Sequence, residues 1–390
     1  MITRFDGCTG CGACEAVCPV MAIKMEENEE GFLYPNANKE ICMNCGKCDR
    51  VCSSRQAFRI CSKKECYAVS YIQNKNKVFS SSGGVFAALA ETILESGGYV
   101  CGAAYVKDCP SKVQHRIICD KTELPLLQGS KYVQSDAWIV FVAIRHILEE
   151  GKIVLFSGTP CQVAGLKSYL NKTYENLYTV EVICHGVPSE KIFRDYLKNS
   201  FGANVSEFAF RDKRFGWGYM ATARMHSGKE AHIHRKASSY YDGYIRGYFL
   251  RKSCYLCSFA NEERCADITI GDYWGVFQNH RKELLKDIKS WESGVSACIV
   301  NTDAGHLLFE ATENKVKKLT TSFDQISAEN YRLLHGNKIP DKREELMTQY
   351  RLVGYTGIEA DFQKHRDSTL KTAVKEMLPG RIKFLLKCIK

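Results

Sequence analysis

Eight cysteines near the N-terminus constrain this chain more than any other feature. They form two runs with the same spacing, C-x2-C-x2-C-x3-C, which are Cys8, Cys11, Cys14 and Cys18, then Cys42, Cys45, Cys48 and Cys52. Four thiols within eleven residues are typical of segments that bind 4Fe-4S clusters. The alternatives are zinc sites, which usually pair C-x2-C units across a longer spacer, and a disulfide scaffold, which needs an oxidising compartment. We expect clusters.

These runs make residues 1–60 resemble a two-cluster bacterial ferredoxin. In that family the fourth cysteine of each run reaches across to the other cluster. The resemblance therefore implies two crossed ligand sets, which are Cys8, Cys11, Cys14 and Cys52 for one cluster and Cys42, Cys45, Cys48 and Cys18 for the other. Apolar segments at 22–25 and 31–34 flank an acidic stretch and predict a β-hairpin that covers the clusters.

The length of 390 residues allows two or three domains, of which the ferredoxin module would be one. Twenty cysteines and no apolar leader segment at the start favour a reducing compartment, and we expect a cytoplasmic protein. No run approaches the roughly 18 to 20 apolar residues that a membrane-spanning helix needs.

Charge is unevenly distributed along the chain. Residues 1–60 contain seven Lys and Arg against eight Asp and Glu, so the basic excess behind the net charge of +10 lies entirely in the remainder. A basic body suits anionic ligands or an acidic protein partner. Nucleic acid is disfavoured as a partner because the basic residues are scattered and no recognised binding motif is present.

Beyond the ferredoxin module, strand and helix patterns alternate. Strands are expected at 67–73, 99–106, 153–156, 177–183 and 294–301, and helices at 87–95, 136–149, 163–170, 304–314 and 324–334. This alternation predicts an α/β fold (mixed α+β) with parallel strands and crossover helices. Ligands of such sheets bind beyond the carboxyl ends of the strands, where Cys161 and Cys184 fall.

Two polar loops stand out as ligand-binding candidates. Residues 80–86 read SSSGGVF and lead directly into a predicted helix, so hydroxyl groups and backbone N–H groups meet the positive end of a helix dipole. The same residues are also typical of an ordinary helix N-cap that binds no ligand. Residues 128–135 read QGSKYVQS and offer one lysine, two amides and hydroxyls in a single loop.

Six segments together resemble the beta subunit of coenzyme F420 hydrogenase/dehydrogenase. They are SSSGGVF at 80–86, GSKYVQS at 129–135, FSGTPCQVAGL at 156–166, CHGVPS at 184–189, FRDKRFGWG at 210–218 and DITIGDYWG at 267–275. The resemblance covers about residues 67–302 and implies an FAD-binding oxidoreductase with a further 4Fe-4S cluster. Such a protein exchanges electrons between a two-electron carrier and one-electron centres. Some members of the family reduce other compounds or lie beside surface-polysaccharide genes.

The resemblance places the flavin on the two polar loops and on the turn after the strand at 153–156. The expected cofactor-binding residues are Ser81, Ser82, Gly83, Gly84, Lys131, Gln134, Ser135 and Thr159. Of these, Ser82, Gly83 and Gly84 are expected to face the pyrophosphate, and Lys131 a phosphate or the flavin edge.

Three further cysteines predict the third cluster. Cys254, Cys257 and Cys265 lie within twelve residues, and Cys161 is the first choice for the fourth ligand, with Cys184 second. A zinc knuckle is the alternative, because a C-x2-C pair fits both metals.

His185, Asp212 and Lys213 are the catalytic candidates, and Arg211 and Asp272 are further charged residues of interest. The segment 211–214 beside Phe215 could clamp an anion next to an aromatic platform, or it could be a solvated charged turn. His185 could donate to a flavin or substrate oxygen, or it could simply hold its turn.

We therefore expect a ferredoxin domain at 1–60, two parts of one flavin domain at 61–150 and 151–320, and a helical extension at 321–390. The extension ends in a basic amphipathic segment that would suit either a membrane surface or packing on the body. The predicted function is an FAD and iron–sulfur oxidoreductase that works with a redox partner protein, such as a ferredoxin or a partner subunit, and a small-molecule substrate. A flavin-free iron–sulfur adaptor docked on a partner enzyme is the alternative.

Overall fold

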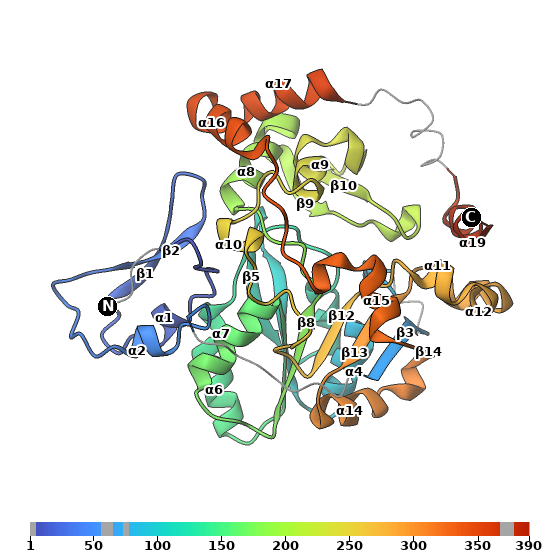
Figure 1. The fold of residues 1–390 in the computed structure, drawn as a ribbon, viewed down its shortest axis with the longest axis horizontal. Helices are drawn as coiled ribbons and strands as arrows, with labels where there is room; N and C mark the ends of the chain where they lie inside the picture. The colour runs from blue at the N-terminus through green and yellow to red at the C-terminus, as the bar shows by residue number, and fades with distance from the viewer. Residues whose placement is uncertain (1–4, 56–64, 73–77, 367–377, 390) are drawn as a thin grey trace.

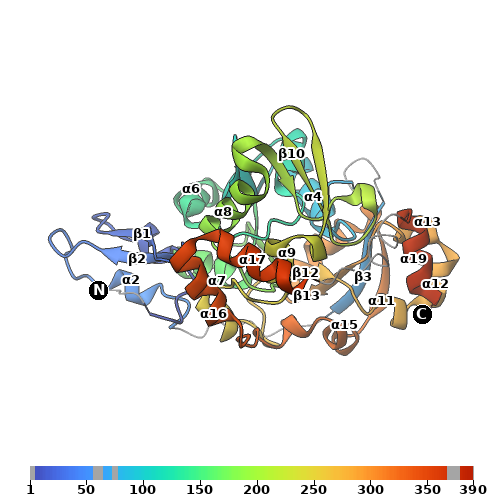
Figure 2. The same ribbon diagram turned by 90° about the horizontal axis from the view of Figure 1, so that it is seen from above.

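The computed structural model describes residues 5–55, 65–72, 78–366 and 378–389. The N-terminal segment projects from one side of the molecule, and the C-terminal helix lies at the opposite end, as both ribbon views show (Figure 1, Figure 2). A large sheet with its helices lies between them.

The N-terminal segment folds as a hairpin flanked by two short helices. The helices are α1 (Ala13–Ala16) and α2 (Lys47–Arg50). The strands β1 (Ile23–Glu27) and β2 (Leu33–Ala37) pair antiparallel, as the sequence predicts. Each helix follows a glycine with positive φ, Gly12 at 72° and Gly46 at 69°, a conformation that costs glycine little.

The main sheet has nine strands in the order β14-β3-β13-β12-β8-β7-β4-β5-β6. The strands are β3 (Glu65–Tyr71), β4 (Tyr99–Val106), β5 (Cys109–Ile118), β6 (Ser135–Asp136), β7 (Val154–Gly158), β8 (Leu177–Val182), β12 (Ile268–Asp272), β13 (Ser296–Val300) and β14 (Val316–Thr321). The central strands β4, β7, β8 and β12 are parallel, and β13, β3 and β14 pair antiparallel with their neighbours. At the other edge β5 pairs antiparallel with β4 and parallel with β6. The predicted parallel pairing thus holds for the central strands and not for the side of the sheet formed by β13, β3 and β14.

Helices cover both faces of this sheet. On one face α4 (Val85–Glu95) and α14 (Asp303–Glu310) pack on Leu155 and Val180, and on the other α6 (Phe141–Glu149) and α7 (Pro160–Leu170) pack on Val154 and Phe156. Neighbouring residues of one strand therefore enter different cores, which follows from the alternation of side chains along a strand. Burial on both faces explains the apolar run Val154, Leu155 and Phe156 at the start of β7.

A second lobe lies above the sheet in Figure 1. It contains a three-stranded antiparallel sheet, β9 (Val205–Ala209), β10 (Met220–Met225) and β11 (Glu230–His234). Its helices are α8 (Glu190–Phe201), α9 (Ser239–Ile245), α10 (Lys252–Tyr255), α16 (Arg343–Val353) and α17 (Tyr355–His365). An aromatic core that includes Phe193, Phe208 and Tyr240 joins them. None of these strands was among the expected elements.

The remaining helices lie mostly at the C-terminal end of the molecule. They are α5 (Leu124–Leu127), α11 (Val276–Asn279), α12 (Arg281–Lys286), α13 (Ile288–Trp291), α15 (Phe323–Glu329) and α19 (Gly380–Ile389). In α19, Phe384 and Cys388 are buried, and Phe384 packs edge-on against Phe277 at 5.2 Å. The amphipathic tail thus packs its apolar face on the body. In the described part of the chain, no helix is both long and apolar enough to cross a bilayer.

The expected segments 61–150 and 151–320 share one structural unit. Strands β3, β4, β5 and β6 come from the first segment and the other five strands come from the second. The expected boundary at residue 60 lies outside the described residues. The fold is mixed α/β, which confirms the predicted class.

Candidate functional site

A cavity of about 320 Å³ opens at the carboxyl edge of the central parallel strands. Its wall includes Ser157 on β7, Cys184 just beyond β8 and Asp272 at the end of β12. This edge is where α/β sheets commonly bind ligands. The volume lies at the lower end of the range for cofactor pockets, about 300 to 1,000 Å³. We call it the first cavity.

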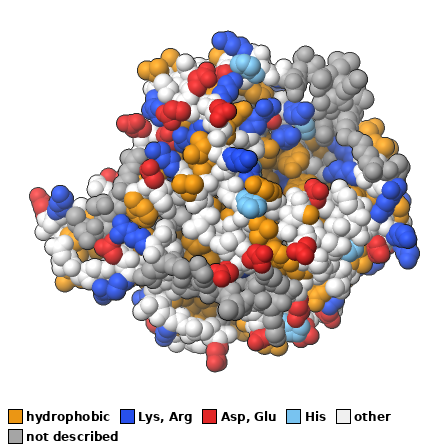
Figure 3. Space-filling view, in the orientation of Figure 1, with side chains coloured by type: hydrophobic (Ala, Val, Ile, Leu, Met, Phe, Trp, Pro, Cys, Tyr) orange, Lys and Arg blue, Asp and Glu red, His pale blue; other side chains and the backbone are white. Residues whose placement is uncertain are grey.

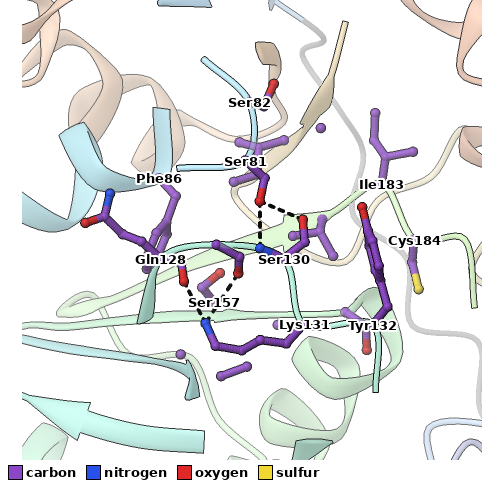
Figure 4. Close-up of a pocket in the computed structure, with 18 of the residues that line it drawn as sticks. Ser81, Ser82, Phe86, Gln128, Ser130, Lys131, Tyr132, Ser157, Ile183 and Cys184 are labelled. Atoms are coloured by element: carbon purple, nitrogen blue, oxygen red, sulfur yellow. Dashed lines mark hydrogen bonds between the residues drawn. The ribbon is translucent and has the colours of Figure 1, made fainter. Parts of the chain in front are cut away.

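The loop 80–84 forms one rim of the first cavity and runs into α4. Ser81 Oγ accepts hydrogen bonds from Ser130 N at 2.6 Å and from Ser130 Oγ at 2.8 Å, as Figure 4 shows. The two polar loops predicted separately therefore meet. The N-cap of α4 is Gly84, so no N-cap side chain accepts hydrogen bonds from the first N–H groups of the helix.

Lys131 brings a cationic side chain to the first cavity. Its Nζ donates to the backbone oxygens of Gln128 at 2.7 Å and Gly129 at 3.3 Å, which are neutral acceptors (Figure 4). Burial lowers the pKa of Lys131 to about 7. An anionic ligand would raise that pKa again, because a nearby negative charge favours the protonated form.

The two glycines of the loop have different environments. Gly83 does not line the cavity. A Cβ on this residue would lie 2.2 Å from Val69 O, so glycine is required here for close packing on β3. Gly84 lines the cavity with φ of 87°, and its Cβ would lie 3.0 Å from Tyr71 Cβ. A side chain at Gly84 would thus meet protein as well as the cavity.

Ser82, Ser135 and Thr159 also line the first cavity. Ser82 Oγ donates to Val295 O at 2.9 Å. Gln162 joins the other two: its Nε2 donates to Ser135 Oγ at 2.9 Å, and its Oε1 accepts from Thr159 N at 2.9 Å. A capping box at the start of α7 therefore positions two of the predicted residues.

A second cavity shares a wall with the first. Residues common to both are Thr159, Gln162, Cys184, His185, Gly186 and Val187. Four cysteines line the second cavity, and they are Cys161, Cys184, Cys254 and Cys257. Burial raises the pKa of each of these thiols, and the repulsion between neighbouring thiolates raises the pKa of the first three further.

Cys265, which the sequence suggested as a ligand with Cys254 and Cys257, lies outside this wall. It is 2% exposed, and its backbone N donates to Glu181 Oε2 at 3.2 Å. Glu181 also forms a buried ion pair with Arg264 at 2.5 Å. The structure therefore brings both alternative fourth ligands, Cys161 and Cys184, to the wall of the cavity. Cys265 lies behind this wall, beside a buried ion pair and in the same packing cluster as Cys257.

His185 lies between the two cavities. Its Nε2 lies 3.1 Å from Tyr244 O, so this nitrogen carries the proton and donates to the carbonyl. Burial lowers the pKa of His185 to about 4, which keeps the ring neutral near pH 7.

Asp212 and Lys213 do not line either of these two cavities. Asp212 accepts hydrogen bonds from Arg214 in the same turn and from Thr222 Oγ1 on β10. Lys213 Nζ donates to Ser82 O at 2.7 Å and also to Ser293 O, so it ties the loop 80–84 to the turn before β13. Arg211 pairs at 2.7 Å with Asp272, which does line the first cavity.

The eight N-terminal cysteines form two groups. Cys18, Cys42, Cys45 and Cys48 line one small cavity. The pKa of Cys14 is raised by burial and then by the charges of Cys11, Cys8 and Cys52. The assignment of the crossed sets as the ligands of two clusters stays a prediction. Among the described residues, no three Cys, His, Asp or Glu side chains are arranged to hold one metal ion. A zinc site would need each ligand sulfur about 2.3 Å from a single ion.

The second cavity reaches the N-terminal domain. Thr9 and Gly10, between Cys8 and Cys11, line it together with Gln134. Gln134, expected at the flavin, instead lies against this loop, with Nε2 3.4 Å from Thr9 O and 3.5 Å from Gly10 O. The two cavities therefore form a continuous series from the strand ends to the loop that carries Cys8 and Cys11.

Sequence reasoning missed several rings that line the first cavity, among them Phe86, His115, Tyr132 and Tyr244. Tyr132 lies within the quoted segment 129–135 and stacks on Tyr244 at 4.6 Å. His115 lies on β5, and its Nε2 is 3.0 Å from Ser157 O. No sequence pattern pointed to His115, because β5 itself was not predicted.

Two segments of the chain match known families. Residues 7–55 match the 4Fe-4S dicluster domain, and residues 151–325 match the C terminus of the coenzyme F420 hydrogenase/dehydrogenase beta subunit. The protein is thus an iron–sulfur protein with an α/β body. More particularly, one segment of the chain is similar to a ferredoxin-type dicluster domain and a second to the C terminus of that beta subunit, which confirms the resemblance drawn from the sequence.

Curated relatives and a solved structure are also similar. One subunit of the F(420)H(2) dehydrogenase of Methanosarcina mazei is 21% identical over 242 residues, 58% of this chain and 68% of that protein. The coenzyme F420-dependent sulfite reductase of Methanocaldococcus jannaschii is 27% identical over 194 residues, and the match spans 50% of this chain but only 30% of that protein. A chain of the F420-reducing NiFe hydrogenase complex from Methanosarcina barkeri has a TM-score of 0.49 at 14% identity, over 75% of this chain and 94% of its own length.

Proposed function

We propose that this protein is an iron–sulfur flavoprotein oxidoreductase that connects a two-electron carrier with one-electron carriers. FAD would occupy the first cavity, a third 4Fe-4S cluster the second cavity, and two clusters the N-terminal domain. The observation that carries the proposal is the continuity of the sites: the cavities share six wall residues, and the second ends at the loop between Cys8 and Cys11.

The residues of the first cavity suit the parts of a flavin dinucleotide. The uncapped N-terminus of α4 and the hydroxyl groups of the loop 80–84 would bind the pyrophosphate. Lys131 would neutralise a phosphate or contact the flavin edge, and Tyr132 would present an aromatic ring to the ligand. Bound there, the flavin would supply the conversion between two-electron and one-electron transfer.

The second cavity suits a cluster because four cysteines line its wall. We propose Cys161, Cys184, Cys254 and Cys257 as the ligands, which replaces Cys265 by Cys184 in the set suggested by the sequence. Thiolates must be unprotonated to bind metal, and the metal itself would overcome the raised pKa values of these buried thiols. Arg264 lines the same cavity, and its charge is balanced by Glu181.

A reduced deazaflavin of the F420 type is the first electron donor to test. The names of both curated relatives refer to this coenzyme. Lys and Arg side chains occur among acidic ones on the face shown in Figure 3, so net attraction of an anionic donor would come from the overall charge of +10. Reduced ferredoxin and other small organic compounds are further candidates, with NAD(P)H below them for want of a G-x-G-x-x-G turn.

Anaerobic purification followed by absorbance spectroscopy tests the cofactors. We expect resolved flavin bands above broad cluster absorbance, release of FAD on denaturation, and about twelve iron atoms per chain. Iron and sulfide without flavin would contradict the proposal and favour an adaptor. Each reduced donor is then mixed with the oxidised protein in a stopped flow, and flavin bleaching within seconds by one donor assigns it. Bleaching by none would indicate a missing partner subunit.

A further inference from the structure

Arg251 occupies an unusual position between the N-terminal domain and the body. It is 0% exposed, and its Nε donates to Cys8 O at 2.7 Å. Its Nη2 donates to Leu33 O at 2.8 Å and lies 3.6 Å from Cys8 Sγ. Its Nη1 donates to Gln134 Oε1 at 3.2 Å, and Tyr34 stacks on the guanidinium at 4.1 Å.

The charge of Arg251 has no carboxylate against it in the described part of the chain. Its polar contacts there are two carbonyls, one amide and one thiol. The other strongly buried arginines differ in this respect: Arg211 pairs with Asp272, Arg264 with Glu181 and Arg343 with Glu30. A buried cation without a counter-charge is strongly destabilising, so an anion is expected at this position.

The cysteine group that includes Cys8 can supply this anion. Thiolates of Cys8, Cys11, Cys14 and Cys52 around a 4Fe-4S cluster carry net negative charge, and the contact of Arg251 with Cys8 Sγ places the guanidinium against that charge. The fit requires a close approach of the loop: a Cβ on Gly10 would lie 2.9 Å from Arg251 Nη1. Glycine at position 10 lets the loop approach the cation.

The backbone of the same arginine is hydrogen-bonded to two residues that line the second cavity. Its backbone N donates to Val187 O, and its backbone O accepts from Cys254 N, both at 2.9 Å. Burial raises the pKa of the Cys254 thiol to about 11, and the charge of Arg251 offsets part of that increase. Arg251 thus acts on a cysteine of each group, one in the N-terminal domain and one in the body.

The other N-terminal group has no comparable cation among the described residues. Cys45 is exposed, and the nearby Arg50 Nη2 donates to Cys45 O at 3.2 Å in an exposed position. Charges in contact with water are screened much more than buried ones. The two clusters of the domain therefore have unequal electrostatic surroundings.

We propose that Arg251 is the positioning residue that provides the counter-charge of the cluster held by Cys8, Cys11, Cys14 and Cys52, and that it makes this cluster the more easily reduced of the two in the N-terminal domain. Reduction adds one electron and no proton, so negative charge beside the guanidinium increases and the reduced form is stabilised. The body side of the domain then becomes the point where electrons collect. This inference depends on the dicluster domain and not on the proposed flavin.

The test is a reductive titration with dithionite, followed by electron paramagnetic resonance of the clusters. In Arg251→Gln we expect the potential of one cluster to fall, by about 59 mV for each tenfold loss in its electron affinity. Arg251→Lys keeps a charge and should show a smaller decrease. The Cys45→Ser background, which alters the other cluster, assigns the signal that shifts.

Arg343→Gln is the matched control. Arg343 is also buried and also ties the N-terminal domain to the body, through Glu30 at 2.8 Å, but its side chain donates to Tyr255, Glu30 and Leu250 and to no cysteine of the described chain. The cluster potentials of the Arg343→Gln variant should equal those of the unmodified protein. Loss of one cluster from Arg251→Gln, with retention in Arg251→Lys and Arg343→Gln, would also support the counter-charge. Unchanged potentials in Arg251→Gln, or equal cluster loss in all three variants, would overturn the proposal.

Discussion

At the residue scale, the cavities are controlled by side chains whose charge depends on burial. Lys131 and His185 have their pKa values lowered to about 7 and about 4, so His185 is neutral near pH 7 while Lys131 is near its midpoint. The thiols of the second cavity have raised pKa values and need a metal to become thiolates. Local charge states thus depend on what is bound.

Lys131 predicts a pH dependence of flavin binding. With a free pKa of about 7, it is cationic below and neutral above that pH, and a bound phosphate would raise the pKa. Flavin affinity of the apoprotein should therefore fall as pH rises above 7, by up to about tenfold per unit. Lys131→Met should bind more weakly and show a flat profile between about pH 6.5 and 8.5. Fluorescence titration measures both, and a parallel decline in the variant would remove Lys131 from the flavin site.

The cysteines of the second cavity predict an asymmetric pair of variants. Cys184→Ser should lower the iron content by up to about four atoms, since Cys184 lines the cavity. Cys265→Ser should keep the full content because Cys265 lies outside that wall. Iron analysis and the ferredoxin-type resonance signals check the result. Loss of iron in Cys265→Ser alone would restore the ligand set suggested by the sequence.

At the element scale, the loop before α4 depends on tertiary contacts more than its sequence suggests. The loop 80–84 is held by Ser130, Val295 and Lys213, which come from three other parts of the chain. A glycine-rich helix start is therefore both a ligand-binding segment and a packing element. A bulky residue at Gly84 would not test flavin binding alone, because its Cβ would also meet Tyr71.

Gly84 and Gly97, at opposite ends of α4, form a matched pair for stability. Both have positive φ, 87° and 74°, but a Cβ on Gly97 would have no neighbour within 4 Å. Gly97→Ala should cost only the backbone strain, about 1 to 2 kcal/mol. Gly84→Ala should cost more, since Tyr71 must shift. Denaturant unfolding of the apoprotein measures the free energy of unfolding of both variants. Equal losses would show that Tyr71 shifts at no cost.

At the scale of the whole molecule, the sites form a sequence of positions from the sheet edge to the tip of the N-terminal domain. The outermost group, around Cys45, is surrounded by exposed apolar side chains, with Met21 at 78%, Met43 at 60% and Ile41 at 51% exposure. Apolar surface of this kind beside a redox centre suits transient contact with a protein partner.

This rim predicts where a one-electron partner docks. Met43→Glu should slow electron transfer to a ferredoxin-type acceptor, about tenfold if the contact is worth about 1.4 kcal/mol. Leu307→Glu, an equally exposed position on α14 at 61%, is the control and should leave the rate unchanged. Stopped-flow rates with the prereduced protein measure the effect. Equal rates in both variants would place the partner elsewhere.

The sequence by itself determined what depends on spacing along the chain. The two cysteine runs, the hairpin between them and the alternating central strands follow from short-range patterns, because ligand spacing and side-chain periodicity are local properties. Tertiary structure alone decided which distant residues meet. It brought Cys184 rather than Cys265 to the second cavity, turned Gln134 toward Thr9, and placed Arg251 against Cys8. Such contacts depend on how the sheet edge, the helices and the N-terminal domain pack, and no local pattern encodes that packing.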